Sequence, residues 1–245
     1  MLELYIGNKN YSSWSLRAWL LLKHLDLPFV EHWVSVAGRD YNPALKPLAG
    51  NARVPCLHVD GFQIWESLAI AEYLAESQPA LWPADAQARA RARSIAAEMH
   101  AGFTNLRSAM PMNLKLRLKG KPAAPAVQRD IDRVVEIWEE ARGRFATADG
   151  PYLFGAFSIA DAMFAPVACR FDCYNVPLPT VAATLRWKMK IAMKLKKAAN
   201  STAWPGRSTP VDTTVAMEFA ASWKPFMKSK ASATATSRIT THRAA

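Results

Sequence analysis

The first part of the chain opens with a short apolar stretch, and apolar residues at helical spacing follow it. Residues 2–7 predict a β-strand that ends at turn-forming asparagines. The serines between residues 12 and 15 are good N-caps for a helix whose apolar positions continue to Leu27. Residues 29–36 alternate between apolar and polar, which is typical of a second strand. The pattern therefore begins as β-α-β.

A second group of elements follows a broken, proline-containing connection over residues 41–50. Residues 54–59 and 62–64 predict two strands, because the Asp60-Gly61 pair between them is typical of a two-residue hairpin. Helical spacing returns from Glu66 to Glu76. The order β-α-β, linker, β-β-α predicts an α/β, thioredoxin-like domain over residues 1–80.

Every strong pattern beyond residue 84 is helical. Residues 86–103 form an alanine- and arginine-rich helical segment, and residues 130–144 place their apolar side chains on one face. We therefore expect an all-α domain over residues 84–225, with the domain boundary at the prolines of 79–83.

The pattern changes at about residue 183. Between residues 185 and 195 apolar side chains stand at every second position and alternate with basic ones. A helix would spread these apolar groups around its circumference, and an all-α domain offers no sheet to a strand. This part is therefore atypical and is expected to pack poorly. Residues 226–245, rich in Ser, Thr, Ala and Lys, are expected to be a disordered tail.

Composition is that of a folded protein, and charge is unevenly placed. Of 245 residues, 51% are apolar and 21% charged, which excludes disordered and fibrous classes. The net charge of +11 divides into +1 for residues 1–180 and +10 for residues 181–245. Nucleic-acid binding would thus rest on the last quarter alone, and no RNP motif, zinc finger or helix-turn-helix supports it. We expect no nucleic-acid partner.

Cysteine usage indicates a reduced, cytoplasmic protein. Cys56, Cys169 and Cys173 make no disulfide framework and no Cys-x-x-Cys pair. The last two are expected to be buried helix residues, and the histidines lack metal-ligand spacing, so no metal is expected. No apolar run reaches the length of a membrane span, and no secretory leader opens the chain.

Four short motifs then stand in one order along the chain. They are Tyr11-Ser12-Ser13-Trp14-Ser15-Leu16-Arg17, Arg53-Val54-Pro55-Cys56-Leu57, Trp65-Glu66-Ser67-Leu68-Ala69-Ile70 and Gly155-Ala156-Phe157-Ser158-Ile159-Ala160-Asp161. Together they resemble the glutathione S-transferase family, in particular the zeta-type and related bacterial members with a Ser-Ser-x-Ser turn. The resemblance covers roughly residues 2–180. It implies the glutathione-transferase fold and glutathione as co-substrate.

The serine turn is the candidate catalytic element. A hydroxyl at a helix N-terminus can donate to a thiolate, and the positive helix end favours the same anion. The resemblance implies that Ser12 is this donor, with Ser13 beside it and Ser15 behind; the alternative is that these serines only cap the helix. The chain departs from the zeta pattern at Trp14, where that class carries Cys, which leaves zeta-type isomerase chemistry open.

The Val-Pro segment is the candidate site for the peptide backbone of glutathione. By resemblance Pro55 is cis, which turns the N–H and C=O of Val54 toward the ligand as an added strand would meet them. The alternative is an ordinary trans proline at the edge of a sheet.

Each charged group at the two ends of glutathione needs a complementary partner in the protein. The resemblance implies that Glu66 pairs with the ammonium and that Ser67, at a helix start, holds the γ-glutamyl carboxylate. The alternative is an ordinary first-turn acid followed by a capping serine. Lys46 or Arg53 would bind the glycine carboxylate, and both remain open.

A further segment resembles one bacterial branch of the family, in which it lines the pocket for the second substrate. The alternative for its apolar members is core packing. The candidates are His100, Phe103, Arg107 and Met110. Ser158 and Asp161 have capping-box spacing, and for them we expect a structural role.

Two functions of different classes follow. The first is a homodimeric glutathione transferase, acting in detoxification, that ionises glutathione and adds it to an electrophilic small molecule. The second is a non-catalytic, glutathione-transferase-like binding or regulatory protein. The intact serine, Val-Pro and Glu-Ser motifs favour the enzyme.

Overall fold

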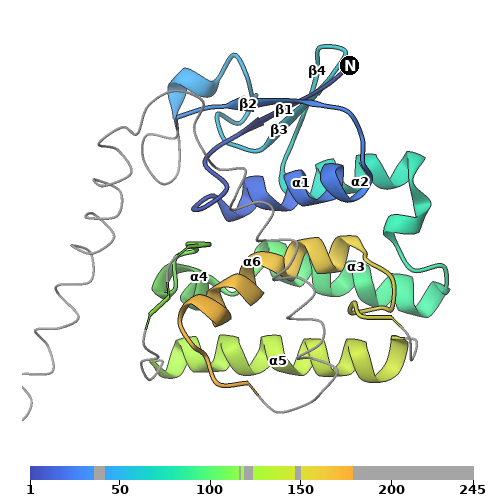
Figure 1. Cartoon of the computed structure of the whole chain (residues 1–245), viewed down its shortest axis with the longest axis vertical. Helices are drawn as coiled ribbons and strands as arrows, with labels where there is room; N and C mark the ends of the chain where they lie inside the picture. The colour runs from blue at the N-terminus through green and yellow to red at the C-terminus, as the bar shows by residue number, and fades with distance from the viewer. Residues whose placement is uncertain (36–41, 116, 119–123, 147–149, 179–245) are drawn as a thin grey trace, which may run out of the picture. The chain divides into compact units, whose positions relative to one another are not determined.

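The computed structural model describes residues 1–35, 42–115, 117–118, 124–146 and 150–178 (Figure 1). The expectations for the atypical part from residue 183 and for the tail from residue 226 lie outside these residues. The described residues form a four-stranded sheet with two helices, followed by four further helices.

The N-terminal elements occur in the predicted order. The sheet has the strand order β2-β1-β3-β4; β2 is parallel to β1, and the other two neighbouring pairs are antiparallel. This arrangement confirms the thioredoxin-like fold. The elements are β1 (Leu2–Ile6), α1 (Ser13–His24), β2 (Val30–Trp33), the 3₁₀ turn η1 (Pro43–Leu45), β3 (Cys56–Val59), β4 (Phe62–Trp65), α2 (Ser67–Ser77) and the 3₁₀ turn η2 (Pro79–Leu81).

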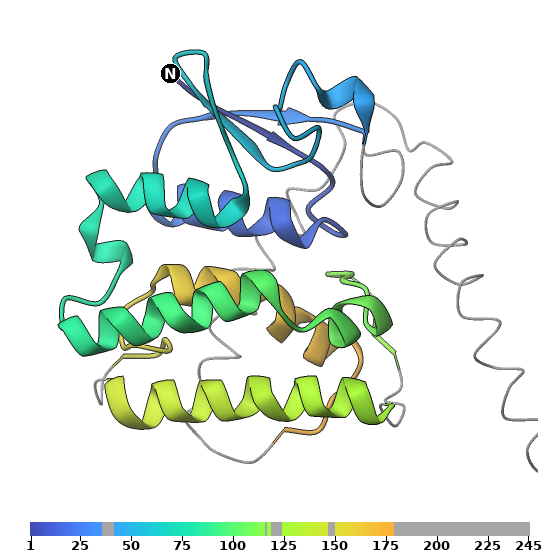
Figure 2. The same cartoon turned by 180° about the vertical axis from the view of Figure 1, so that it is seen from behind.

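The two faces of the sheet differ. Alternation along β1 sends Leu4 and Ile6 into the core, under α1 and α2, which lie on one side of the sheet in Figures 1 and 2. On the other face Tyr5 stacks against His32, with ring centroids 4.4 Å apart, and against His58 at 4.3 Å. The described helices of this domain therefore lie on one face of the sheet, and the predicted site motifs lie at the ends of its elements.

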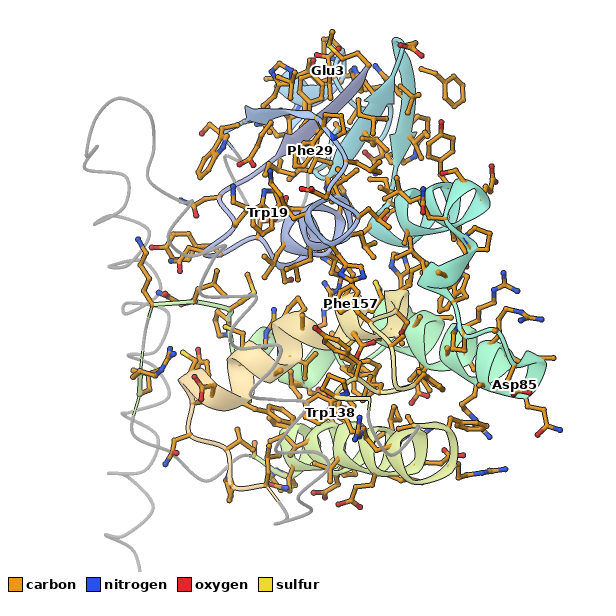
Figure 3. All side chains as sticks on the ribbon, turned by 45° about the vertical axis from the view of Figure 1, so that its right-hand side comes forward. Glu3, Trp19, Phe29, Asp85, Trp138 and Phe157 are labelled. Carbon is orange, nitrogen blue, oxygen red and sulfur yellow. The ribbon has the colours of Figure 1, made fainter. Side chains whose placement is uncertain are left out.

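The later described elements are helical: α3 (Ala86–Ala101), α4 (Thr104–Ala109), α5 (Pro125–Phe145) and α6 (Ile159–Cys173). α3 ends two residues earlier than its pattern predicts, because Phe103 adopts a left-handed φ of 58° and redirects the chain into α4. α5 begins earlier than predicted, at a proline, which suits the first turn of a helix. Trp138 of α5 is fully buried among these helices and packs against Phe164 and Phe171 of α6 (Figure 3).

The start of α6 is a capping box, as the spacing predicts. The Asp161 carboxylate is fully buried and accepts from the backbone N–H and the hydroxyl of Ser158, at 2.8 and 2.9 Å. It also accepts from the N–H of Leu153 at 2.9 Å. A carboxylate at this position satisfies helix-end donors that would otherwise be buried unpaired.

α1 is buried on almost every side. Its residues from Ser15 to Leu22 are all buried, because one face packs on the sheet and another on α6. Arg17 of α1 donates from Nε to the backbone carbonyl of Met163 in α6, at 2.9 Å. The helix that carries the serine turn is therefore also the contact between the sheet and the helices that follow it.

Candidate active site

The serine turn is held by a short hydrogen-bond chain. Ser12 is the N-cap of α1, and its Oγ accepts from the N–H of Ser15 at 3.4 Å. The Ser12 hydroxyl lies 2.8 Å from Oγ of Ser15, which accepts from the N–H of Gly7 at 3.1 Å. Ser15 is fully buried whereas Ser12 is half-buried, so the turn presents one hydroxyl at the positive end of α1.

The Val-Pro segment has the predicted backbone form. The peptide bond between Val54 and Pro55 is cis, directly before β3. Asn51 closes the preceding turn by accepting from the N–H of Arg53 at 3.1 Å. Val54 is half-buried at the edge of the domain, where its backbone groups can meet an extended peptide.

The start of α2 places a carboxylate beside a buried hydroxyl. Glu66 is the N-cap residue, with a left-handed φ of 71°, and its Oε1 accepts from Nδ2 of Asn51 at 3.3 Å. Ser67 is 1% exposed, and its Oγ has no hydrogen-bond partner among the described residues. A buried hydroxyl without a partner at a helix N-terminus is a ready donor for an anion.

A hollow of about 280 Å³ lies beside these motifs and joins residues from both parts of the fold. Four predicted glutathione-binding residues and two predicted second-substrate residues line it together. Its lining residues are Trp14, Asn51, Arg53, Val54, Pro55, Glu66, His100 and Arg107.

Six predicted site residues do not line this hollow: Ser12, Ser13, Lys46, Ser67, Phe103 and Met110. Lys46 donates from Nζ to the carbonyl of Gly50 at 2.6 Å, which leaves Arg53 as the candidate cation at the pocket wall. Phe103 and Met110 are 8% and 7% exposed and belong to the hydrophobic core, the alternative that the sequence left open for them.

Trp14 is the centre of a group of cationic side chains. The guanidinium carbon of Arg17 lies 4.2 Å from its ring centroid and that of Arg107 lies 4.9 Å away. The imidazole of His100 meets the indole edge-on, with ring centroids 5.3 Å apart. Guanidinium groups are attracted to the electron-rich face of an indole, so these contacts hold the ring in the pocket wall.

A third arginine lies beneath the serine turn. Arg170 of α6 is 4% exposed, donates from Nε to the carbonyl of Met110 at 2.8 Å and points Nη2 at Oγ of Ser13, 3.4 Å away. Burial lowers its pKa to about 10. Burial also lowers the pKa of Arg17, and Arg170 and Arg107 lower it further. Among the described residues no carboxylate forms an ion pair with these three arginines, so the site carries net positive charge.

The sequence analysis missed Trp14, Arg17 and Arg170 as site residues. Each arginine stands alone in an otherwise apolar helical run, and such a charge on a buried face was the available signal. The arginine contacts across 90 residues or more could not be inferred from local spacing.

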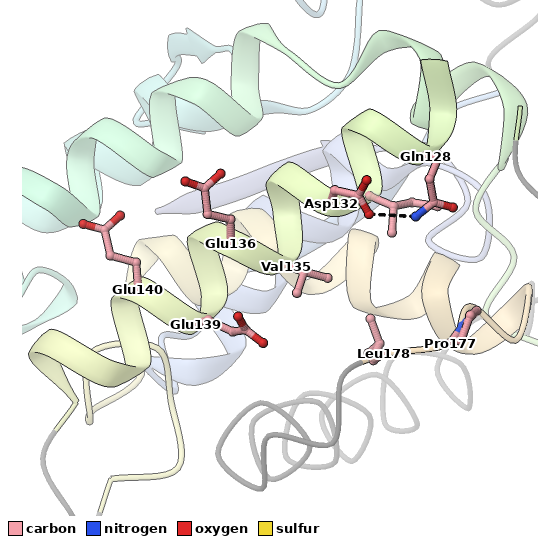
Figure 4. A pocket seen from close by; sticks show the side chains of 9 residues that line it. Gln128, Asp132, Val135, Glu136, Glu139, Glu140, Pro177 and Leu178 are labelled. Atoms are coloured by element: carbon pink, nitrogen blue, oxygen red, sulfur yellow. Dashed lines mark hydrogen bonds between the residues drawn. The ribbon is translucent and has the colours of Figure 1, made fainter. Parts of the chain in front are cut away.

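A larger hollow of about 750 Å³ runs along α5 and contains none of the predicted site residues (Figure 4). Ile131, Val135 and Leu178 form its apolar wall, and four carboxylates, from Asp132, Glu136, Glu139 and Glu140, surround it. Gln128 donates to Asp132 at 2.7 Å, and the group offers no nucleophile or base paired for chemistry.

Within the described ranges no cluster of three His, Cys, Asp or Glu residues could hold a metal ion. No helix in the same ranges is long and apolar enough to span a bilayer. Cys169 and Cys173 are buried in α6, as the sequence predicts.

The described residues thus combine a thioredoxin-like sheet, a cis-proline directly before β3 and a following set of helices. Comparison with known proteins gives the family. A model of the glutathione S-transferase N-terminal domain matches residues 11–77. A probable maleylacetoacetate isomerase of Caenorhabditis elegans is 30% identical over 187 residues, which are 73% of this chain and 84% of that protein. The maleylacetoacetate isomerase of Rattus norvegicus is 28% identical over 186 residues, which are 73% and 83% of the two chains.

Solved structures of glutathione transferases share the fold of this chain. A Burkholderia glutathione transferase homologue with bound glutathione superposes with a TM-score of 0.58 and 25% identity, covering 82% of this chain and 97% of that one. A diazinon-metabolizing glutathione S-transferase of the silkworm Bombyx mori shares the fold, with a TM-score of 0.62 at 20% identity over 82% of this chain and 97% of that one. The chain belongs to the glutathione S-transferase family, and it is an enzyme of that family.

Proposed function

We propose that this protein binds glutathione in the pocket beside α1 and α2, ionises its thiol at Ser12 and conjugates it to an electrophilic small molecule. One observation carries the proposal. The cis Val54-Pro55 bond and Glu66 line the same hollow as Trp14, which follows Ser12 by two residues at the start of α1. Glutathione is the ligand whose thiol, peptide backbone and charged ends these groups complement.

The proposed binding mode uses one group for each part of the peptide. The backbone of Val54 pairs with the cysteinyl unit, the unpartnered hydroxyl of Ser67 donates to the γ-glutamyl carboxylate, and Glu66 accepts from the ammonium group. Arg53, at the wall of the same hollow, binds the glycine carboxylate.

Ionisation follows from the surroundings of the thiol. A free thiol has a pKa of about 8.5, and a charge-assisted hydrogen bond contributes about 1.5–3 kcal/mol, enough to lower that pKa by one to two units. Ser12 donates this bond, and the helix end with buried Arg17 and Arg170 adds positive potential. The proton leaves to solvent. The thiolate sulfur forms a bond with the electrophilic carbon of the second substrate; in a substitution the leaving group departs with its bonding electron pair, and in an addition the displaced π electron pair takes up a proton from solvent.

A second candidate is isomerisation of an anionic substrate, the activity named in the curated relatives. The arginine group favours it, because three cationic side chains without a paired carboxylate suit a substrate that carries one. Trp14 stands where the zeta class carries Cys, which favours conjugation instead.

The test measures glutathione binding and two enzymatic activities of the full chain. Retention on immobilised glutathione followed by turnover of a chromogenic electrophile supports conjugation. Turnover of maleylacetoacetate without net consumption of glutathione supports the second candidate. Retention without either activity would assign a non-catalytic binding protein, the alternative class. Sedimentation of the same sample tests the homodimer that we propose with this function.

A further inference from the structure

His100 of α3 reaches the start of α2. Its Nε2 lies 3.8 Å from Oε2 of Glu66, and its ring meets Trp14 edge-on at 5.3 Å. His100 is in the last turn of α3, where the negative end of the helix favours a positively charged or donating side chain.

Of the two ring nitrogens of His100, only Nε2 has a polar neighbour among the described residues. Nδ1 of His100 is buried and has no hydrogen-bond partner in the described part of the chain, whereas Nε2 faces the carboxylate. The other oxygen of Glu66 accepts from Asn51 at 3.3 Å, so each carboxylate oxygen has one polar neighbour, a hydrogen-bonded one at Oε1 and the His100 ring at 3.8 Å from Oε2. The Glu66 side chain is 50% exposed, and without these neighbours it would sample several rotamers.

We infer that His100 is a positioning residue for Glu66 and contributes to glutathione affinity rather than to contact with the second substrate. The inference rests on the proposed function, because it assigns Glu66 the ammonium group of glutathione. A carboxylate fixed in its binding orientation loses less conformational freedom when the ligand arrives, and this lowers the dissociation constant. The contact links a residue of the helical part to the glutathione-binding end of α2.

The test is calorimetric titration of the full chain with glutathione. His100→Ala weakens binding about three- to fivefold, the range expected for loss of a partly exposed polar contact. His100→Gln restores most of the affinity, because its amide can place an N–H near the position of Nε2. With a chromogenic electrophile, His100→Ala raises KM for glutathione by the same factor and changes kcat by less than about twofold. A purely structural role would lower the melting temperature without this split and without rescue.

The fold offers a matched control. His32 contacts Glu3 through Nε2 at 2.8 Å on the sheet face opposite α1 and α2, and neither residue lines the pocket. His32→Ala therefore removes a similar His–Glu contact and leaves glutathione affinity unchanged.

A double-mutant cycle separates this inference from its premise. In a Glu66→Gln background, His100→Ala changes the dissociation constant by less than about 1.5-fold if His100 acts through Glu66. A full loss in that background, or no loss from His100→Ala alone, overturns the inference. Failure of the unmutated protein to bind glutathione overturns the proposed function itself.

Discussion

The guanidinium of Arg170 lies 3.4 Å from the hydroxyl of Ser13, although 157 residues separate them in the chain. Both side chains are buried, and Arg170 is held in place by the carbonyl of Met110 at 2.8 Å. The turn that begins α1 is thus supported from α6. The site is assembled by tertiary packing, and its serines differ in what they contact.

That difference leads to a prediction for Ser12. Ser12→Ala removes the half-buried hydroxyl at the helix end, so the thiol pKa of bound glutathione rises by about one to two units and turnover at pH 7 falls about tenfold or more. Glutathione affinity changes little, because the peptide contacts remain. Thiolate absorbance measured against pH tests this. Ser13→Ala is the comparison, and identical profiles for Ser12→Ala and the unmutated protein would reject the assignment.

Substitutions of Glu66 and Ser67 at the start of α2 are expected to weaken glutathione binding and to leave its ionisation unchanged. Glu66→Ala or Ser67→Ala weakens glutathione binding by roughly 1–3 kcal/mol, the value of a charge-assisted hydrogen bond. Calorimetric titration measures the loss, and the thiol pKa of the bound peptide stays the same. Unchanged affinity in both variants would show that these residues only begin a helix.

Substitution distinguishes the two candidate partners of the glycine carboxylate, Arg53 and Lys46. Arg53→Ala weakens glutathione binding by about 1 kcal/mol or more, because Arg53 lines the pocket and its charge is lost. Lys46→Ala has a smaller effect, since Nζ of Lys46 is bonded to the carbonyl of Gly50. If Lys46→Ala weakened glutathione binding more than Arg53→Ala, Lys46 would be the residue that binds the glycine carboxylate.

Asp161 is predicted to act on stability alone. Asp161→Ala leaves the N–H groups of Leu153 and Ser158 without their buried acceptor, so the free energy of unfolding falls by about 3 kcal/mol or more. Denaturant titration measures the loss. Asp132→Ala, which removes an exposed carboxylate from α5, changes stability by less than about 0.5 kcal/mol. Equal losses in the two variants would contradict the capping role.

The cysteines are predicted to be inert in the folded protein. Burial raises the pKa of Cys56 to about 11 and that of Cys169 to about 12, and it also raises the pKa of Cys173. At pH 8 only about one Cys56 side chain in a thousand is a thiolate. Iodoacetamide should therefore label none of them natively and all three in guanidinium chloride. Rapid native labelling at a single site, found by mass spectrometry, would identify an exposed thiol instead.

The sequence was sufficient for the elements whose signals are local. Periodicity, the Asp60-Gly61 turn and the Ser158–Asp161 spacing predict the four strands and the starts of α1, α2, α3 and α6. The start of α5 was predicted five residues late, and α4 was not predicted as a separate helix. The end of α3 was predicted two residues late, although Gly102, which directly follows the last residue of the helix, is a typical signal for a helix end.

The site also contains residues that the sequence predicted and residues that it did not. The motif residues Val54, Pro55 and Glu66 line one hollow, as the resemblance to the glutathione S-transferase family implies, and their role in binding glutathione stays a prediction. Arg107 was predicted as a pocket residue, whereas Trp14, Arg17 and Arg170 were not. Arg107 and Arg170 come from α4 and α6, and only packing brings them to Trp14 and Ser13 at the start of α1. Local spacing carries no information about such contacts.

The burial of α1 on both faces limits how this protein can be recombined. A chimera that joined its first 80 residues to the helical half of a relative would need a partner surface matched to Arg17 and to the carbonyl of Met163. Without that match a buried guanidinium loses its acceptor next to the serine turn. The two halves are therefore not interchangeable modules, and substitutions on the α6 side of α1 must be accommodated by changes in α6.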